Sequence, residues 1–266
     1  MSLSQEERGE LFRNGNVEEV KRFLKDNPTW DVNEVLNGNG WTALHLASHY
    51  GHHEIISLLL VYTEINVNQR TNHGETPFFL ACHDEEIETA KVLLRDPQVD
   101  INPPNNLGRT PLWIACCYGN AAVIKWMIAS GRDLFLDEKG QDWDNSEYYT
   151  ALDIAETWFK TEVVSLLEGF VKNQTQTRHE VRVELGVVDA LAAELFATTV
   201  FLCDDFLRIR KPDSNSKAGR FLRIVSRLPM ELQMVLCHRV YGSDKDNIPS
   251  KDSEPAFRHL ASLYQK

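Results

Sequence analysis

A short motif recurs along this 266-residue chain at a nearly fixed spacing. Residues 40–48 read GWTALHLAS, residues 74–82 read GETPFFLAC and residues 108–116 read GRTPLWIAC, so successive copies begin 34 residues apart. A fourth copy, YTALDIA at 149–155, places its threonine 40 residues after that of the third copy. Self-similarity at such a period predicts a solenoid of stacked helical repeats, because one short unit cannot bury its apolar face alone.

Each copy carries the signals of a helix start and stop. Thr42, Thr76 and Thr110 are suited to cap a helix with the hydroxyl group, and a proline follows at 77 and 111. Glycines at 51 and 119 are suited to end that helix. A second apolar helix is predicted after each stop, and residues 5–28 read as one more helical pair.

The Thr-Pro-Leu-His-like motif, its preceding glycine, the Leu-rich second helix and the Val-Asn loops resemble ankyrin repeats. The resemblance covers residues 5–170, in about five repeats of which the first and last are degenerate. It implies an all-α solenoid of helix–loop–helix repeats with β-hairpin fingers, used for protein binding and not for catalysis. The motif histidine occurs only at His45. An acidic insertion at 136–147, containing Trp143, is expected to form a loop that lengthens one finger.

Beyond the repeats, residues 171–266 are expected to form a C-terminal helical domain. A long helix with an apolar stripe is predicted over 187–209, followed by a polar linker at 211–217. Shorter helices are predicted near 218–227, 229–241 and 252–264.

The composition of 42% hydrophobic and 25% charged residues is that of an ordinary folded protein. No signal peptide or membrane span is recognisable, and five cysteines without a framework spacing indicate reduced thiols. We therefore expect a cytoplasmic monomer, with the nucleus as an alternative location. The net charge is −11, and residues 1–171 carry 27 acidic and 13 basic side chains. Such an acidic repeat region favours a basic protein partner and disfavours nucleic acid, although solubility alone also explains it.

The concave face of an ankyrin-like stack is formed by the fingers and by the first helix of each repeat. Residues at its variable positions are candidates for protein binding, because exposed Trp, Tyr and Arg anchor protein interfaces. The alternative is that the C-terminal domain covers this face. The candidates are Asn39, Trp41, Leu46, His49, Tyr50, His73, Glu75, Leu80, His83, Asp84, Leu107, Arg109, Ile114, Cys117, Tyr118, Trp143, Tyr148 and Trp158.

The segment LPMELQMVL at 228–236 resembles the opening of an F-box, the helical motif that docks on the adaptor of cullin-type ubiquitin ligases. This resemblance implies a substrate receptor of such a ligase, with the concave face holding the substrate. The alternative is an ordinary core helix begun by a proline. The docking residues would be Leu228, Pro229, Met230, Glu231, Leu232 and Leu236.

Cofactor, metal and catalytic motifs are not recognisable. His49 and His53 are four residues apart, but Gly51 interrupts the helix between them. The calcium-like start at Asp142 lacks the required glycine. No phosphate-binding glycine motif or activated nucleophile is present. We therefore expect no cofactor, no metal and no enzymatic activity.

Overall fold

The computed structural model of the chain describes residues 3–83, 86–144, 147–203, 230–240, 248, 253, 255 and 256. Contacts divide it into two units, residues 1–178 and 179–266, each of which is described by itself. The elements are α1 (Gln5–Asn14), α2 (Val17–Asp26), α3 (Ala43–His49), α4 (His53–Leu59), α5 (Pro77–His83), α6 (Ile87–Arg95), α7 (Pro111–Tyr118), α8 (Ala121–Ala129), β1 (Gly140–Gln141), β2 (Tyr148–Tyr149), α9 (Ala151–Thr157), α10 (Thr161–Lys172), α11 (Gln174–Glu184), α12 (Val188–Cys203) and α14 (Met230–Val240).

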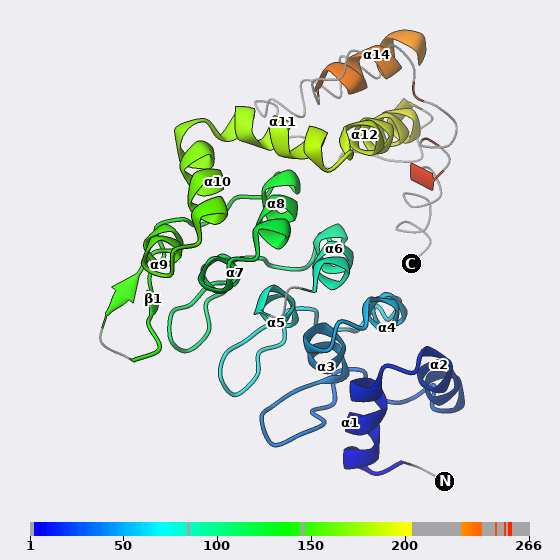
Figure 1. Cartoon of the computed structure of the whole chain (residues 1–266). Coiled ribbons are helices and arrows are strands. Elements are labelled where there is room, and N and C mark those ends of the chain that lie inside the picture. The colour runs from blue at the N-terminus through cyan, green and yellow to red at the C-terminus, as the bar shows by residue number, and fades with distance from the viewer. Residues whose placement is uncertain are drawn as a thin grey trace. The chain divides into compact units, whose positions relative to one another are not determined.

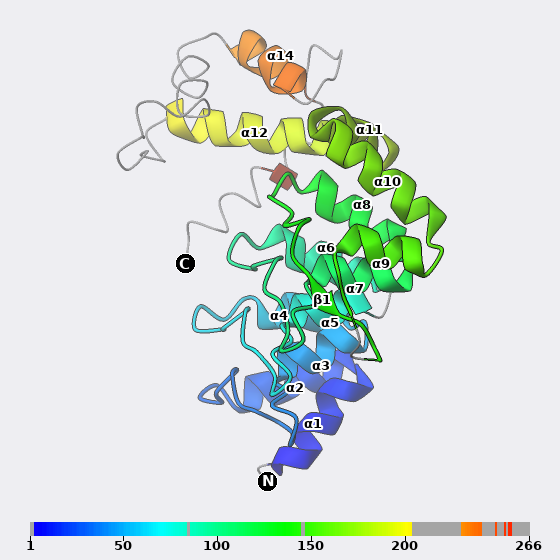
Figure 2. The ribbon, with the colours of Figure 1, turned by 90° about the vertical axis from the view of Figure 1, so that its left-hand side faces the viewer.

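The first unit is a stack of helical hairpins in two layers. The inner helices α1, α3, α5, α7 and α9 pack one on the next, and the outer helices α2, α4, α6, α8 and α10 form the second layer. Figures 1 and 2 show this succession from two sides, with the long loops projecting from the inner layer. The predicted all-α repeat architecture is confirmed, and the expected helical pair at 5–28 is its first hairpin.

Threonine hydroxyl groups begin the inner helices as predicted. Thr42, Thr76 and Thr110 accept hydrogen bonds from backbone N–H groups three residues later, and Thr150 does the same although it was not predicted. His45 adds the reciprocal half of the cap, because its Nδ1 accepts from the N–H of Thr42 at 3.2 Å. These caps satisfy donors that a short, buried helix would otherwise leave unpaired.

Backbone hydrogen bonds join each finger to the next one. The N–H of Asn72 donates to the Asn39 carbonyl, and the N–H of Asn106 donates to that of His73, both at 2.9 Å. The insertion continues this ladder, since the N–H of Gln141 donates to the Leu107 carbonyl at 2.9 Å. Asparagines of the Val-Asn loops do the same on the other side of the fingers, where Asn33 Nδ2 donates to the Glu64 carbonyl at 2.8 Å. The repeat spacing is therefore fixed by polar contacts as well as by apolar packing.

The insertion forms a short hairpin and is not wholly a loop. β1 and β2 pair antiparallel, with Gly140 opposite Tyr149 and Gln141 opposite Tyr148. Most of the insertion is a loop, as expected, and only Gly140–Gln141 within it forms a strand. The fifth hairpin, α9 and α10, follows directly.

The first unit extends eight residues past the expected boundary at 170. The buried Phe170 ring lies under the Arg178 guanidinium, with 5.4 Å from Cζ to the ring centroid. Arg178 also donates to the Arg132 carbonyl at 3.0 Å, and Thr177 is buried. The start of α11 therefore packs against the end of the stack. The polar sequence of this helix did not predict that role.

In the second unit, α12 packs against α14. Its described core contains Ala193, Phe196, Ala197, Cys237, Ile248 and Ala256. Helices were predicted at both places, and α14 agrees with the predicted helix at 229–241. The linker predicted at 211–217 and the helix predicted at 218–227 lie outside the described residues. Among the described helices, none combines the length and the apolar character that crossing a bilayer requires.

Candidate functional site

A first aromatic cluster lies at the end of α3 and consists of Trp41, His49, Tyr50 and His52. The Trp41 ring contacts the His49 ring edge to face, with the centroids 5.0 Å apart. His49 contacts Tyr50 at 4.7 Å, and Tyr50 stacks on His52 at 6.2 Å. Trp41 and His49 are half-buried, whereas Tyr50 is 41% exposed. The cluster offers a partner a pre-ordered aromatic surface with little side-chain entropy left to lose.

A second aromatic cluster consists of His83 at the end of α5, Tyr118 at the end of α7 and Trp143 of the insertion. His83 and Tyr118 lie 4.5 Å apart, and Tyr118 and Trp143 lie 6.3 Å apart, between ring centroids. Trp143 Nε1 also reaches Cys117 Sγ at 3.4 Å. The insertion therefore folds back along α7, which brings its tryptophan beside a tyrosine of the preceding repeat.

Several candidates are buried and cannot anchor a partner. The expectation that they are exposed was wrong. Four of them lie on α3, α5 or α7, and each of these helices is covered by an inner helix on either side and by an outer helix. The buried candidates are Leu46, Leu80, Arg109, Ile114 and Cys117.

Arg109 is buried for a further reason, which is the insertion itself. Its guanidinium Cζ lies 3.9 Å from the centroid of Trp143 and 5.1 Å from that of Trp113. Its Nε donates to the Gln141 carbonyl at 2.6 Å. Burial lowers the pKa of Arg109, which still leaves the group charged at neutral pH. Arg109 therefore holds the β1–β2 hairpin against the stack and is not available to contact a partner.

The remaining candidates differ in position. Asn39, His73 and Leu107 are exposed at the finger tips, and Glu75 is half-buried at the base of one finger. Tyr148 and Trp158 are exposed on the last repeat. Asp84 lies outside the described residues. The candidates that the structure leaves exposed or half-buried are Asn39, Trp41, His49, Tyr50, His73, Glu75, His83, Leu107, Tyr118, Trp143, Tyr148 and Trp158.

The β1–β2 hairpin formed by the insertion is strongly acidic. The Tyr149 hydroxyl group donates a hydrogen bond to the Glu147 carboxylate. This bond, together with the charges of Glu147, Asp142 and Asp144, raises the pKa of Tyr149 to about 12. Asp142, Asp144 and Glu147 place three carboxylates on this short segment, a charge that favours cationic groups.

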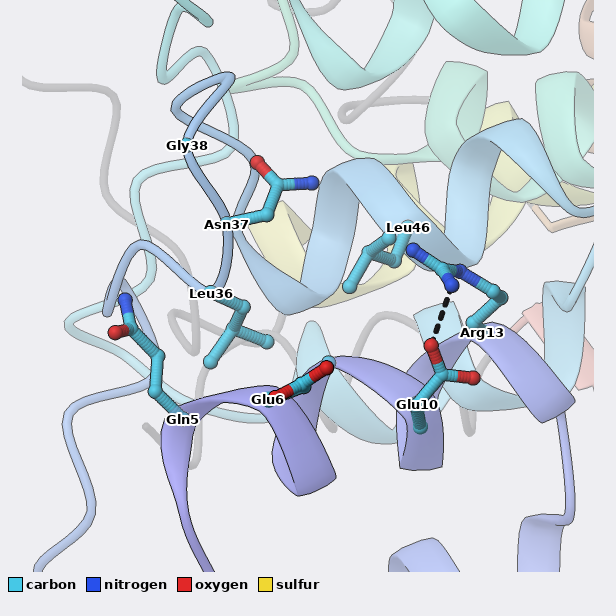
Figure 3. A pocket seen from close by; sticks show the side chains of 9 residues that line it. Gln5, Glu6, Glu10, Arg13, Leu36, Asn37, Gly38 and Leu46 are labelled. Atoms are coloured by element: carbon cyan, nitrogen blue, oxygen red, sulfur yellow. Dashed lines mark hydrogen bonds and ion pairs between the residues drawn. The ribbon is translucent and has the colours of Figure 1, made fainter.

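A hollow of about 480 Å³ lies between α1 and the first finger, and sequence reasoning missed it. Figure 3 shows Glu6, Glu10 and Arg13 of α1 facing Leu36, Asn37 and Leu46 across it. Glu10 and Arg13 form an ion pair. The sequence could have indicated this hollow, because charged residues spaced three and four positions apart lie on one face of a helix such as α1. The hollow extends the acidic character of the concave face to its N-terminal end.

The F-box-like segment is only partly described. Leu228 and Pro229 lie outside the described residues, as do the side chains of Met230, Glu231 and Leu232. Helix α14 begins at Met230, and Leu236 is half-buried within it.

The described part of the chain shows neither a metal-binding cluster nor, at Cys82 and Cys116, a reactive thiol. It contains no group of three or more His, Cys, Asp or Glu side chains placed to hold a metal ion. Burial raises the pKa of the Cys82 and Cys116 thiols, so both are protonated and unreactive at neutral pH.

Comparison with protein-family models identifies ankyrin repeats in this chain. A model of three ankyrin repeats matches residues 11–105, and a single-repeat model matches residues 107–138. A search of curated proteins finds no match. The ankyrin resemblance is thus confirmed for residues 11–138, and the fifth hairpin continues the same architecture beyond the matched range.

Proposed function

We propose, on the premise that residues 11–138 are ankyrin repeats, that this chain binds a partner protein through its concave face and catalyses no reaction. The observation that carries the proposal is the pair of aromatic clusters. Their rings are held by mutual contacts, yet Tyr50, Tyr118 and Trp143 stay between 38% and 47% exposed. Ordered aromatic side chains that remain accessible are the usual energetic centres of protein interfaces.

The partner is proposed to present a basic surface. Residues 1–171 carry a net charge of −14. Glu6 and Glu10 line the hollow beside the first finger, and Asp142, Asp144 and Glu147 belong to the segment that carries Trp143. Charges of this kind accelerate association with a partner of opposite sign and exclude acidic competitors. Binding should therefore weaken as the salt concentration rises, since exposed charges are screened.

The test is to change exposed aromatic residues without disturbing the core. Tyr50→Ala and Tyr118→Ala are each expected to weaken binding at least tenfold, about 1.4 kcal/mol, because each removes a large ring from the contact. Partners captured by the immobilised full chain are identified by mass spectrometry and then titrated against the purified variants.

Val61→Ala is the matched control, because Val61 is 64% exposed just after the outer helix α4. It should bind like the wild type, and all three variants should keep the native circular dichroism spectrum. Equal affinity of the wild type and both tyrosine variants would contradict the assignment of the concave face.

A second candidate is the substrate receptor of a cullin-type ubiquitin ligase. It is favoured by one observation, the start of α14 at Met230, where the F-box-like segment requires a helix. Under this proposal a cullin complex co-purifies with the wild-type chain and is lost with Leu232→Asp. Co-purification with neither chain would leave plain protein binding as the function.

A further inference from the structure

The turn between α9 and α10 is built like the turns at Gly51 and Gly119, with one difference. The N–H of His52 donates to the Ala47 carbonyl, that of Asn120 to Ala115 and that of Lys160 to Ala155, at 2.8–2.9 Å. The residue before each donor is left-handed, with φ of 75° at Gly51 and 82° at Gly119. In the last turn this residue is Phe159, with φ of 54°. A left-handed conformation is unfavourable for any residue with a Cβ atom, so Phe159 is strained where glycine is not.

In the turns at Gly51 and Gly119, side chains of the next repeat pack against the glycine. A Cβ atom on Gly51 would lie 2.3 Å from the Glu86 carboxylate, and one on Gly119 would lie 2.9 Å from the Lys160 side chain. Phe159 belongs to the fifth hairpin, and its side chain is 87% exposed. The stack therefore leaves room for a side chain at this place, but its own packing gains nothing from the phenyl ring.

The neighbourhood of Phe159 is both aromatic and acidic. Trp158 precedes it and is 48% exposed. Residues 153–162, which surround Phe159 in the sequence, carry three carboxylates (Asp153, Glu156 and Glu162) against a single lysine, Lys160. A second copy of this chain would bring like charges together, which disfavours self-association through this surface. A segment with an apolar side chain flanked by basic ones matches it in both respects.

We propose that Trp158 and Phe159 are an anchor for a protein segment that carries an aromatic or aliphatic side chain between lysines or arginines. The proposal rests on the proposed function, because it places a second contact at the end of the same stack, and it assigns Phe159 a role in partner choice. An exposed ring on a strained backbone lowers stability without benefit to the fold, and such residues are concentrated at binding sites.

The test uses the substitution Phe159→Gly, which removes the ring and introduces the residue that stands at the same place in the turns at Gly51 and Gly119. The melting temperature is expected to rise by roughly 2–4 °C, since the strain is relieved. A random 16-residue peptide library displayed on phage is selected on the full-length chain. Enriched peptides are expected to contain an apolar residue between basic ones, and to bind the Phe159→Gly chain at least tenfold more weakly than the wild type.

Two control substitutions sharpen the result. Trp158→Ala should weaken the same peptides, whereas Phe135→Ala should not, although Phe135 is also an exposed phenylalanine, in the loop between α8 and β1. Peptides that bind the wild type and Phe159→Gly equally, acidic peptides, or no enriched peptide would each overturn the inference. So would a dimer in sedimentation that dissociates in Phe159→Gly, because the surface would then bind a second copy. The Tyr50→Ala and Tyr118→Ala variants test the proposed function independently. If they weaken partner binding while one of the contradicting results above is obtained, the proposed function stands and only the Trp158–Phe159 anchor is ruled out.

Discussion

Trp113→Ala is expected to lower the free energy of unfolding by about 3–5 kcal/mol, the cost of removing a large aromatic side chain from a core. Trp113 is completely buried in the middle of the stack, on α7 between α5 and α9. The smaller side chain leaves a cavity that two rows of packed helices cannot fill by collapsing. Urea denaturation followed by circular dichroism measures the loss.

Trp113 also supplies a hydrogen bond that packing arguments alone would miss. Its Nε1 donates to the Tyr149 carbonyl at 2.9 Å. Tyr149 directly precedes Thr150, the capping residue of α9. In the second repeat His45 bonds to the Glu75 carbonyl, which directly precedes Thr76, at 3.3 Å. The two side chains thus perform the same task of fixing the start of the next inner helix, although their chemistry differs.

Two further substitutions separate the contributions of Trp113. Trp113→Phe keeps most of the ring and removes the donor, so it should cost about 1–3 kcal/mol for the unsatisfied Tyr149 carbonyl. Trp143→Ala removes a tryptophan that is 47% exposed and should cost less than Trp113→Ala. Equal losses for Trp113→Ala and Trp143→Ala would show that burial does not determine the cost here.

The helices could be predicted from the sequence because their determinants are local. Thr42 and Thr110 cap the helices that their position suggested, and Gly51 and Gly119 end the same helical turns. The 34-residue spacing also implied the stacking of fingers, since a fixed period allows the same hydrogen bonds to recur. Local chemistry and a constant repeat length therefore accounted for most of the first unit.

The concave face was harder to predict because exposure is not a local property. Leu46 and Ile114 occupy variable positions but are 1% exposed, since neighbouring inner helices close over them. Arg109 became a support for Trp143 only because the six extra residues of the last spacing fold back along α7. Phe159 differs from these residues because it is exposed and they are buried. The sequence shows that it occupies a glycine position, but its exposure depends on the lack of a further repeat that would cover it.

Acidification is expected to destabilise the stack well before its carboxylates titrate, because of His45. This side chain is fully buried, and burial lowers its pKa from 6.5 to about 4. Its Nδ1 already accepts the N–H of Thr42, and its Nε2 donates to the carbonyls of Gln69 and Glu75, so the folded protein has no place for a second proton. The unfolded chain binds that proton below pH 6.5, and the folded chain does so only near pH 4.

Stability should therefore be complete above pH 6.5 and decrease as the pH falls towards 4, because in that window the unfolded state binds more protons. The difference between the pKa of His45 in the unfolded chain, 6.5, and in the folded chain, about 4, lowers the free energy of unfolding by about 2 kcal/mol at pH 5 and by about 3 kcal/mol at pH 4. Carboxylates with lowered pKa, such as Asp153, contribute only below about pH 4. Urea denaturation at several values between pH 7 and pH 5 isolates the histidine.

His45→Gln is the matched control, since glutamine can keep the reciprocal cap with Thr42 but does not titrate. The variant should be less stable than the wild type at pH 7, because it gives up the contact with Glu75, and its stability should change much less between pH 7 and pH 5. The His45 ring resonances of the wild type should also show no titration above pH 5 by NMR. A wild-type stability that is flat over this range, or a variant with the same slope, would mean that His45 accepts a proton in the folded state at little cost.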